Sequence, residues 1–443
     1  MQKADTPGLK KVLKPVHLWA IAVGLVISGE YFGWNYGWAV SGTIGFLVAT
    51  LLITVLYITF IFSFTELSAA IPHAGGPFAY AYRALGPVGG FVSGYATLIE
   101  FLFAPPAIAF ALGSYVHFLY PAVPVLYTAL ASYVLFIGIN LLGIKESATF
   151  SLVVTLLAVG ELLLYMGLVA PHFEAANFLA DPLPFELPGI FAALPFAIWF
   201  YLAIEGVAMV AEEVKDPKRN IPKGYIYGLG TLVLLAMGVM VLTGGVANWQ
   251  RLSSIDYPLP EALGIVMGRD SNWTQLFASI GLFGLIASFH GCIIGYSRQL
   301  FALARSGYLP GFLAGVNARF RTPHRALVAG GMVGCLALLT GTTDQVIILS
   351  VLGAVVMYII SMISLFSLRK KEPYLERPFA APFYPWFPAI ALALSAVSLG
   401  AIVYYNPLLS IIFFSGLFLM LGVYLLLGKH RRKITGDALL EVK

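Results

Sequence analysis

The sequence VGLVISGEYFGW (residues 23–34) is an apolar segment that places a carboxylate near the middle of a membrane span. Ser28 and Gly29 have weak helix propensity, and an acidic residue at the centre of a membrane helix costs about 2.5 to 3.5 kcal/mol on insertion scales. We therefore predict that the helix breaks here and that Glu30 has a function.

A similar arrangement recurs in the second half of the chain, where WFYLAIEG (residues 199–206) sets Glu205 beside a second expected break. Two interrupted spans at the starts of two halves are typical of secondary transporters built from inverted repeats. In such transporters the substrate site lies near the bilayer midplane. The two segments together predict a transporter of this kind.

Composition identifies the class of protein. Of the 443 residues, 59% are hydrophobic and only 11% are charged, and the mean hydropathy is +0.87. Apolar runs of about 20 residues recur along the chain, which is the length that crosses a bilayer as a helix. We therefore predict an all-α polytopic membrane protein with twelve transmembrane helices. Their predicted ranges are 16–40 (broken), 43–71, 87–119, 123–142, 147–170, 189–213 (broken), 223–246, 272–304, 324–341, 344–368, 386–405 and 408–428.

The distribution of basic residues predicts the orientation in the membrane. When the N-terminus is placed in the cytoplasm, all of the 26 lysines and arginines except Arg251 and Arg269 fall in cytoplasmic segments. Cytoplasmic loops of membrane proteins are enriched in Lys and Arg. Both termini are therefore predicted to be cytoplasmic. Glu66, Glu212 and Glu213 fall at cytoplasmic helix ends, where we expect ion pairs with Arg83 as one partner.

Several classes of chemistry have no motif in the sequence. There is no phosphate-binding P-loop, no His/Cys cluster with metal-ligand spacing and no Gly-x-Ser-x-Gly nucleophile elbow. Cys292 and Cys335 both fall in apolar segments, so a disulfide is not expected. The net charge of +5 is dispersed among loops and indicates topology rather than nucleic-acid binding. We predict that the protein is not an enzyme and needs neither a cofactor nor a metal.

Three segments resemble conserved loops of amino acid-polyamine-organocation (APC) permeases: FTELSAAIPHAGGPFAY (64–80), AEEVKDPKRNIP (211–222) and SRQLFALARSGYLP (297–310). Within this superfamily, ISGEYFGWNYG (27–37) and HAGGPFAYAYRALGP (73–87) are most similar to bacterial ethanolamine permeases. The resemblance implies a LeuT-like five-plus-five inverted repeat with broken helices 1 and 6, in a bacterial inner membrane. It divides the chain into a cytoplasmic tail (1–15), a first repeat (16–170), a second repeat (189–368), two additional helices (386–428) and a second cytoplasmic tail (429–443).

The resemblance also leads to a substrate prediction. In amino acid permeases, the first helix break presents backbone amides to the substrate carboxylate, and Ser28, Gly29 and Glu30 align with that element. A fixed carboxylate at this position would repel an amino acid carboxylate and attract an ammonium group. We therefore expect import of ethanolamine, which is serine without its carboxylate. The alternatives are an amino acid or polyamine permease or exchanger of the same superfamily and, from another class, a sensor or passive channel.

The second break contributes three candidate site residues. The resemblance places Trp199 as an aromatic gate over the site, where it could form a cation-π contact with an ammonium group. Simple core packing is the alternative. Glu205 occupies a position that is often glutamate in the superfamily and is a candidate for proton coupling or for bonding unwound backbone. Ala203 stands where glycine is usual.

The remaining titratable residues inside predicted spans are Glu100, Glu161 and His290. Ionisable side chains at this depth are functional candidates, with an internal hydrogen bond as the alternative. We assign Glu100 and His290 to substrate binding. The resemblance places Glu161 roughly where proton-coupled relatives carry lysine, so Glu161 and Glu205 are candidates for proton coupling. The membrane potential alone could also drive a cation inward.

Two properties stay open at the level of sequence. Recognition of the substrate hydroxyl could use Ser28, Ser288, Ser350 or unwound carbonyl groups. The oligomeric state has no sequence signal.

Overall fold

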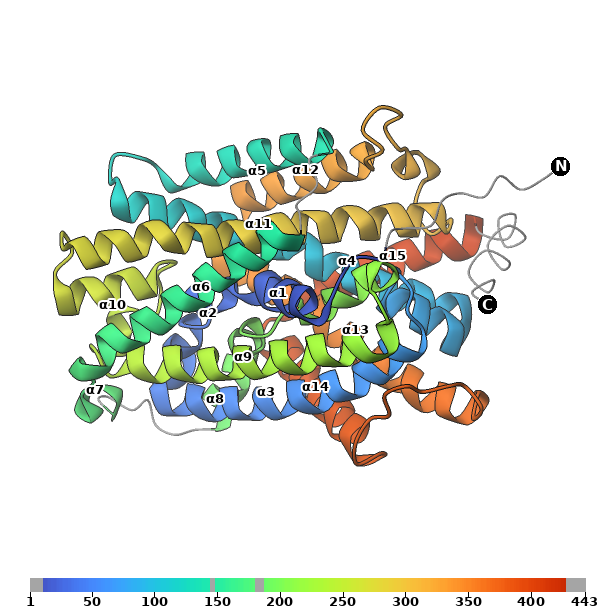
Figure 1. Cartoon of the computed structure of the whole chain (residues 1–443), viewed down its shortest axis with the longest axis horizontal. Helices are drawn as coiled ribbons and strands as arrows, with labels where there is room; N and C mark the ends of the chain where they lie inside the picture. The colour runs from blue at the N-terminus through green and yellow to red at the C-terminus, as the bar shows by residue number, and fades with distance from the viewer. Residues whose placement is uncertain (1–10, 144–147, 180–186, 428–443) are drawn as a thin grey trace.

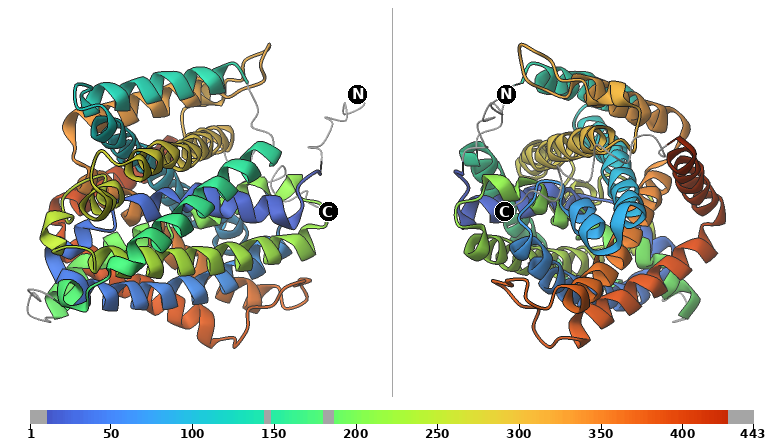
Figure 2. Two further views of the ribbon diagram at one scale, coloured as in Figure 1. Left: turned by 60° about the vertical axis from the view of Figure 1, so that its left-hand side comes forward. Right: turned by 90° about the vertical axis from the view of Figure 1, so that its right-hand side faces the viewer.

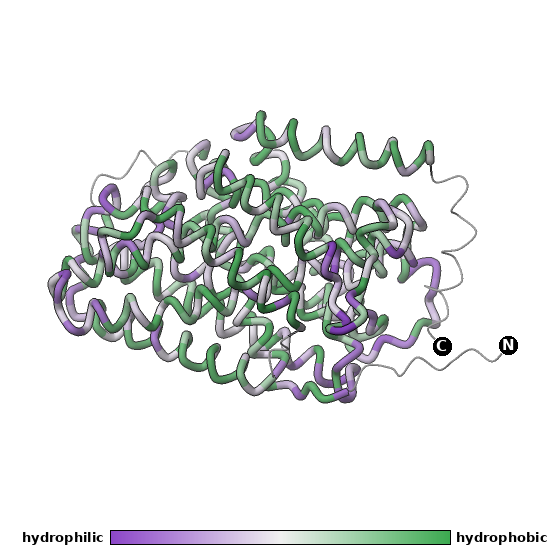
Figure 3. Tube along the Cα trace, turned by 90° about the horizontal axis from the view of Figure 1, so that it is seen from above, coloured by the Kyte–Doolittle hydropathy of each residue, from purple (hydrophilic) through white to green (hydrophobic). Residues whose placement is uncertain are grey.

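The protein is a bundle of helices that run along its long axis, in a computed structural model that describes residues 11–143, 148–179 and 187–427 (Figure 1). Extended pairing among these residues is limited to one bridge between Leu13 and Val214. The predicted tails lie mostly outside the described residues, as does Lys145. Hydrophilic residues gather toward the two ends and the loops, and apolar residues dominate between them (Figure 3).

Long apolar helices account for most of the bundle. In the described part of the chain, nine are long and apolar enough to cross a membrane, which confirms a polytopic membrane protein. Two further helices, α5 and α12, have 17 residues each. The twelve-helix count itself stays a prediction. The longer helices are α3 (Tyr36–Ala70), α4 (Pro77–Leu119), α5 (Val125–Leu141), α6 (Ala148–Val169), α9 (Pro217–Gly244), α11 (Asn272–Arg305), α12 (His324–Thr340), α13 (Thr343–Lys371), α14 (Trp386–Tyr405) and α15 (Pro407–Leu427).

The first predicted span is interrupted twice. Helix α1 (Pro15–Val26) is followed by the short α2 (Ser28–Tyr31), and α3 begins at Tyr36. Between α2 and α3 the backbone of Phe32 is extended, and Gly33 has a φ of 90°, which favours glycine. Ser28 and Gly29 therefore begin a helical turn, and the longer unwound stretch follows at 32–35.

The sixth predicted span changes conformation at Ala203. Helix α8 (Leu187–Trp199) ends at four turn residues, and Ala203 has a left-handed φ of 74°. This conformation costs an L-residue about 1 to 2 kcal/mol. The chain continues as a 3₁₀-helix, η2 (Ile204–Glu213), although 3₁₀ runs longer than about four residues are uncommon. Such stretches often mark hinges.

The helices that surround the two breaks form the buried centre of the bundle. Helices α4 and α13 are the most buried spans and pack against each other, whereas α14 and α15 are the least buried. Helices α5 and α12 lie side by side along one edge (Figures 1 and 2). The short elements are η1 (Ala170–His172), α7 (Ala175–Leu179), η3 (Trp249–Arg251), α10 (Pro258–Met267) and η4 (Gly311–Ala314).

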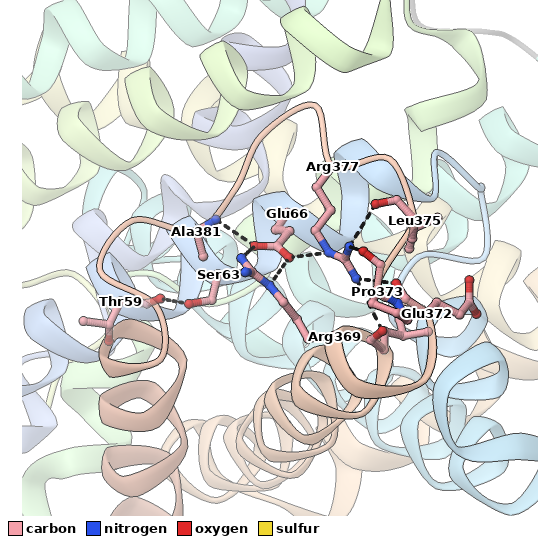
Figure 4. Close-up of polar contacts among 10 residues, drawn as sticks. Thr59, Ser63, Glu66, Arg369, Glu372, Pro373, Leu375, Arg377 and Ala381 are labelled. Carbon is pink, nitrogen blue, oxygen red and sulfur yellow. Dashed lines mark hydrogen bonds and ion pairs between the residues drawn. The ribbon is translucent and has the colours of Figure 1, made fainter.

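Ion pairs join the helix ends on the basic side of the molecule. Glu66, at the end of α3, accepts two hydrogen bonds from Arg369 at 2.8 and 2.6 Å and contacts Arg377 at 3.1 Å (Figure 4). The predicted pairing of Arg83 with Glu66, Glu212 or Glu213 was wrong, because Arg83 pairs with Glu372 at 2.6 Å instead. The segment after α13 is therefore tied to both α3 and α4.

Candidate functional site

A small cavity lies between α1, α4, α11 and the break after α8. Its volume is about 10 Å³, which is room for about one water molecule. Every lining residue except Leu25 is buried, so the cavity lies inside the bundle. The lining residues are Leu25, Val26, Ser28, Ala104, Ile108, Trp199, Leu202, Ala203, Ser288 and Cys292. A substrate larger than water can bind only after these walls separate.

Two serines form the polar wall of the cavity. The hydroxyl of Ser288 donates to the carbonyl oxygen of Leu25 at 2.6 Å, and the hydroxyls of Ser28 and Ser288 are 2.8 Å apart. Because the Ser288 proton is committed to Leu25, Ser28 must donate to Ser288. The lone pairs of Ser28 then stay available to accept a hydrogen bond. Ser350 does not line the cavity, and its hydroxyl donates to the Glu100 carbonyl oxygen.

The two broken helices touch at Trp199. The Trp199 indole donates to the Phe32 carbonyl oxygen at 3.0 Å, and its ring meets the Phe32 ring edge to face. Gly29 lies against the backbone of the same tryptophan, because a Cβ added at position 29 would come within 2.4 Å of the Trp199 carbonyl oxygen. Only glycine allows this approach.

We expect Gly29→Ala to destabilise the folded protein by about 1 to 3 kcal/mol and to abolish transport. The added methyl group would push the Trp199 backbone away and disturb the contact between the two breaks. Thermal unfolding in detergent and uptake by proteoliposomes measure the two effects. Gly138→Ala on α5 is the matched control, since nothing lies within 4 Å of a Cβ there. Equal stability of both variants would contradict this account.

Glu30 is fully buried but is not one of the cavity-lining residues. Its carboxyl oxygens have no hydrogen-bond partner among the described residues. The carboxyl lies within electrostatic range of the Tyr201 hydroxyl, which forms a 2.7 Å hydrogen bond with Thr54 of α3. Glu30 can therefore act on the cavity through its charge, while direct contact requires the walls to move.

Glu100 and Glu205 lie behind the cavity wall. Both are fully buried, and their carboxyl groups interact with each other. The Glu100 carboxyl also lies beside the backbone of Ala203, and the Glu205 carboxyl lies beside the Tyr358 hydroxyl. Two carboxylates this close repel each other unless a proton or another cation lies between them.

Glu161 and His290 do not reach the cavity. Glu161 accepts a 2.7 Å hydrogen bond from the Tyr31 hydroxyl and so links α6 to the first break. The His290 ring packs against Phe136 of α5. His290 lies two residues from both Ser288 and Cys292, so it projects from the opposite face of α11. The structure therefore brings Ser28, Trp199 and Ala203 to the cavity and leaves His290 away from it.

A cluster of hydrogen-bonded polar residues, which no sequence motif predicts, lies at the end of the bundle opposite the basic loops. Asp256, in the loop before α10, accepts hydrogen bonds from Tyr36 of α3 and Thr343 of α13, each at 2.8 Å. Asn35 donates to the carbonyl oxygens of Leu252 and Ile255 at 2.7 and 2.8 Å. The loop is thereby fixed to the unwound segment of the first span.

We expect Asp256 of this cluster to make the free energy of unfolding depend on pH. Burial raises the pKa of Asp256 to about 6, against the opposing effect of its two hydrogen bonds. The folded state therefore binds the proton more tightly than the unfolded chain, and the free energy of unfolding rises as pH falls from about 7 to 4. Unfolding midpoints of wild type and Asp256→Asn across this range test the effect.

The Asp256→Asn variant should lack this rise, and Asp270→Asn, at an exposed position nearby, should retain it. Parallel profiles for wild type and Asp256→Asn would show that another group is responsible.

Comparison with known proteins identifies the class. The family model for amino acid permeases matches residues 13–427. The chain belongs to the amino acid permease family. The protein is therefore a transporter of the APC superfamily and not an enzyme.

The relatives of this permease span different substrates. It is 30% identical to an uncharacterized transporter of Rhizobium meliloti (strain 1021), over 90% of this chain and 88% of that protein. It is 24% identical to the branched-chain amino acid permease BcaP of Bacillus subtilis (strain 168), over 87% and 86%. It is 27% identical to the low-affinity putrescine importer PlaP of Escherichia coli (strain K12), over 76% and 77%.

Proposed function

We propose that this permease imports ethanolamine, a small primary-amine cation, by alternating access. One observation carries the proposal: the buried charge of the described membrane core is acidic. Among the described residues, the buried carboxyl groups without a lysine or arginine partner are those of Glu30, Glu100, Glu161 and Glu205, and no lysine or arginine is buried. A buried carboxylate without a basic partner favours a cationic guest.

Recognition would use the groups around the cavity. The face of Trp199 offers a cation-π contact, and the lone pairs of Ser28 can accept a hydrogen bond from the ammonium group. Glu30, Glu100 and Glu205 supply negative charge from behind the walls. An amino acid carboxylate would be repelled by the same charges.

The transport cycle follows from the proposed fold. In a twelve-helix arrangement with five-plus-five inverted repeats, the two broken helices move against the remaining scaffold and open the cavity to each side in turn. We propose that the protein lies in a bacterial inner membrane with both termini in the cytoplasm. Glu205 and Glu161 are the proposed groups for proton coupling.

Calorimetry on the purified protein tests the substrate. We expect ethanolamine to bind more tightly than putrescine or choline and serine not to bind. Serine binding as tight as ethanolamine binding would overturn the substrate proposal and leave the family intact.

Uptake measured over a pH series at a clamped membrane potential tests the coupling. If protons are co-transported, uptake at a fixed potential rises with the inward proton gradient. A flat response would leave the membrane potential as the driving force, at about 2.3 kcal/mol per charge per 100 mV.

A second candidate is a polyamine or amino acid permease. The similarity to a putrescine importer and the acidic core both favour a diamine among these alternatives. Putrescine binding tighter than ethanolamine binding would select this candidate.

A further inference from the structure

A groove separate from the cavity runs along the surface of the bundle between α6 and α11. Its volume is about 220 Å³. The walls are apolar, and Leu156, Leu157, Leu164, Trp273 and Leu276 are each about half exposed. In a bilayer this surface faces hydrocarbon, so a purely apolar groove would be filled by acyl chains. The groove is lined by Leu156, Leu157, Gly160, Glu161, Leu164, Trp273, Leu276, Phe277 and Ile280.

One of the lining residues of this groove, Glu161, is acidic. The Glu161 side chain is only 4% exposed, and its Oε2 accepts the hydrogen bond from Tyr31. Its Oε1 has no hydrogen-bond partner among the described residues. A Cβ added at Gly281 of α11 would lie 3.2 Å from Oε1, so this oxygen reaches the α6–α11 boundary. A buried oxygen with an unused acceptor site lines an otherwise apolar groove.

The depth of the Glu161 carboxyl group in the membrane limits which ligands can reach it. Gly281 lies nine residues after the first residue of α11, which is about 13 Å along the helix. Glu161 lies near the middle of the candidate membrane span Ala148–His172, next to groove walls that extend in both directions along α6. A ligand that fits both the apolar walls and the carboxyl oxygen of Glu161 needs a hydrocarbon chain and a cation that donates a hydrogen bond.

We propose that this groove binds an amphiphilic amine from the bilayer, with its ammonium group on Glu161 Oε1 and its alkyl chain along the leucines of α6. Charge complementarity favours this occupant over a neutral lipid, because an ammonium paired with a carboxylate in a low-dielectric medium gains strong attraction and satisfies the free oxygen. The amine acts on transport from outside the cavity, since Glu161 also holds Tyr31 of the first broken helix.

The chain offers two variants that separate charge from shape. Glu161→Gln removes the charge and keeps the size of the side chain. Gly160→Leu fills the groove and leaves the hydrogen bond between Glu161 and Tyr31 intact, because nothing lies within 4 Å of a Cβ at position 160.

Photo-crosslinking in phosphatidylcholine nanodiscs tests the proposal without reference to the transported substrate. A dodecylamine with a diazirine in its chain and the corresponding dodecanol are the two probes, and labelled peptides are mapped by mass spectrometry. We expect the amine to label segments 156–164 and 273–280 at least about tenfold more than the alcohol, as a charge-assisted hydrogen bond implies. Unlabelled dodecylamine should compete.

In Glu161→Gln, labelling by the amine should fall to the level of the alcohol. In Gly160→Leu, both probes should lose the site. Equal labelling by amine and alcohol in wild type, or unchanged amine labelling in Gly160→Leu, would overturn the proposal. The second variant keeps the test valid if Glu161→Gln does not fold.

Discussion

Glu30→Gln is expected to weaken ethanolamine binding about 100-fold and to leave the protein folded. Two unit charges about 6 Å apart attract by about 3 kcal/mol at an effective dielectric constant of 20, and each 1.4 kcal/mol is a factor of ten. The substitution removes this attraction and keeps the side-chain size. Because the Glu30 oxygens have no hydrogen-bond partner among the described residues, no protein hydrogen bond is lost. Calorimetry on the purified variant measures the change.

Two further variants define the mechanism. Glu30→Asp keeps the charge and shortens the side chain, so it should retain most of the affinity if Glu30 acts through its field. A loss as large as in Glu30→Gln would indicate direct contact after the walls separate. Glu174→Gln, at an exposed position, is the matched control. Wild-type affinity in Glu30→Gln would remove Glu30 from the substrate site.

The class of fold is predictable from sequence because membrane insertion depends on hydropathy summed over about 20 residues. The position of the first break is less predictable. Weak helix propensity points to Ser28 and Gly29, but the unwound stretch is centred on residues 32–35. There Asn35 binds the carbonyl oxygens of Leu252 and Ile255, more than 200 positions away in the chain. Such a contact leaves no local pattern.

The residues that line the cavity are likewise only partly predictable from the sequence. Ser28, Trp199 and Ala203 are predicted from the two breaks and line it, whereas Ala104, Ile108 and Cys292 come from apolar spans in which no break is predicted. In a helix that is apolar on all sides, sequence does not indicate which face meets a partner. That is why His290 could be predicted as an intramembrane residue, although its side chain lies on the face of α11 away from the cavity.

Glu66→Gln is expected to lower the free energy of unfolding by about 3 to 5 kcal/mol. Glu66 is 1% exposed and accepts hydrogen bonds from Arg369 and from the Ala381 backbone N–H, with Arg377 also in contact (Figure 4). Removing one partner of a buried ion pair leaves the other charges without compensation, which is the costly case. The midpoint of denaturant or thermal unfolding in detergent measures the loss.

The pair between Arg83 and Glu372 is the matched comparison, because it joins the same segment to α4 with side chains that are each about one-third exposed. Glu372→Gln should cost less than about 1 kcal/mol, as is typical of ion pairs open to solvent. If both variants lose the same stability, burial does not decide the strength of these contacts. If only Glu66→Gln is unstable, the buried cluster around Glu66 fixes the segment after α13 to the end of α3. The ion pair between Arg83 and Glu372 then adds little.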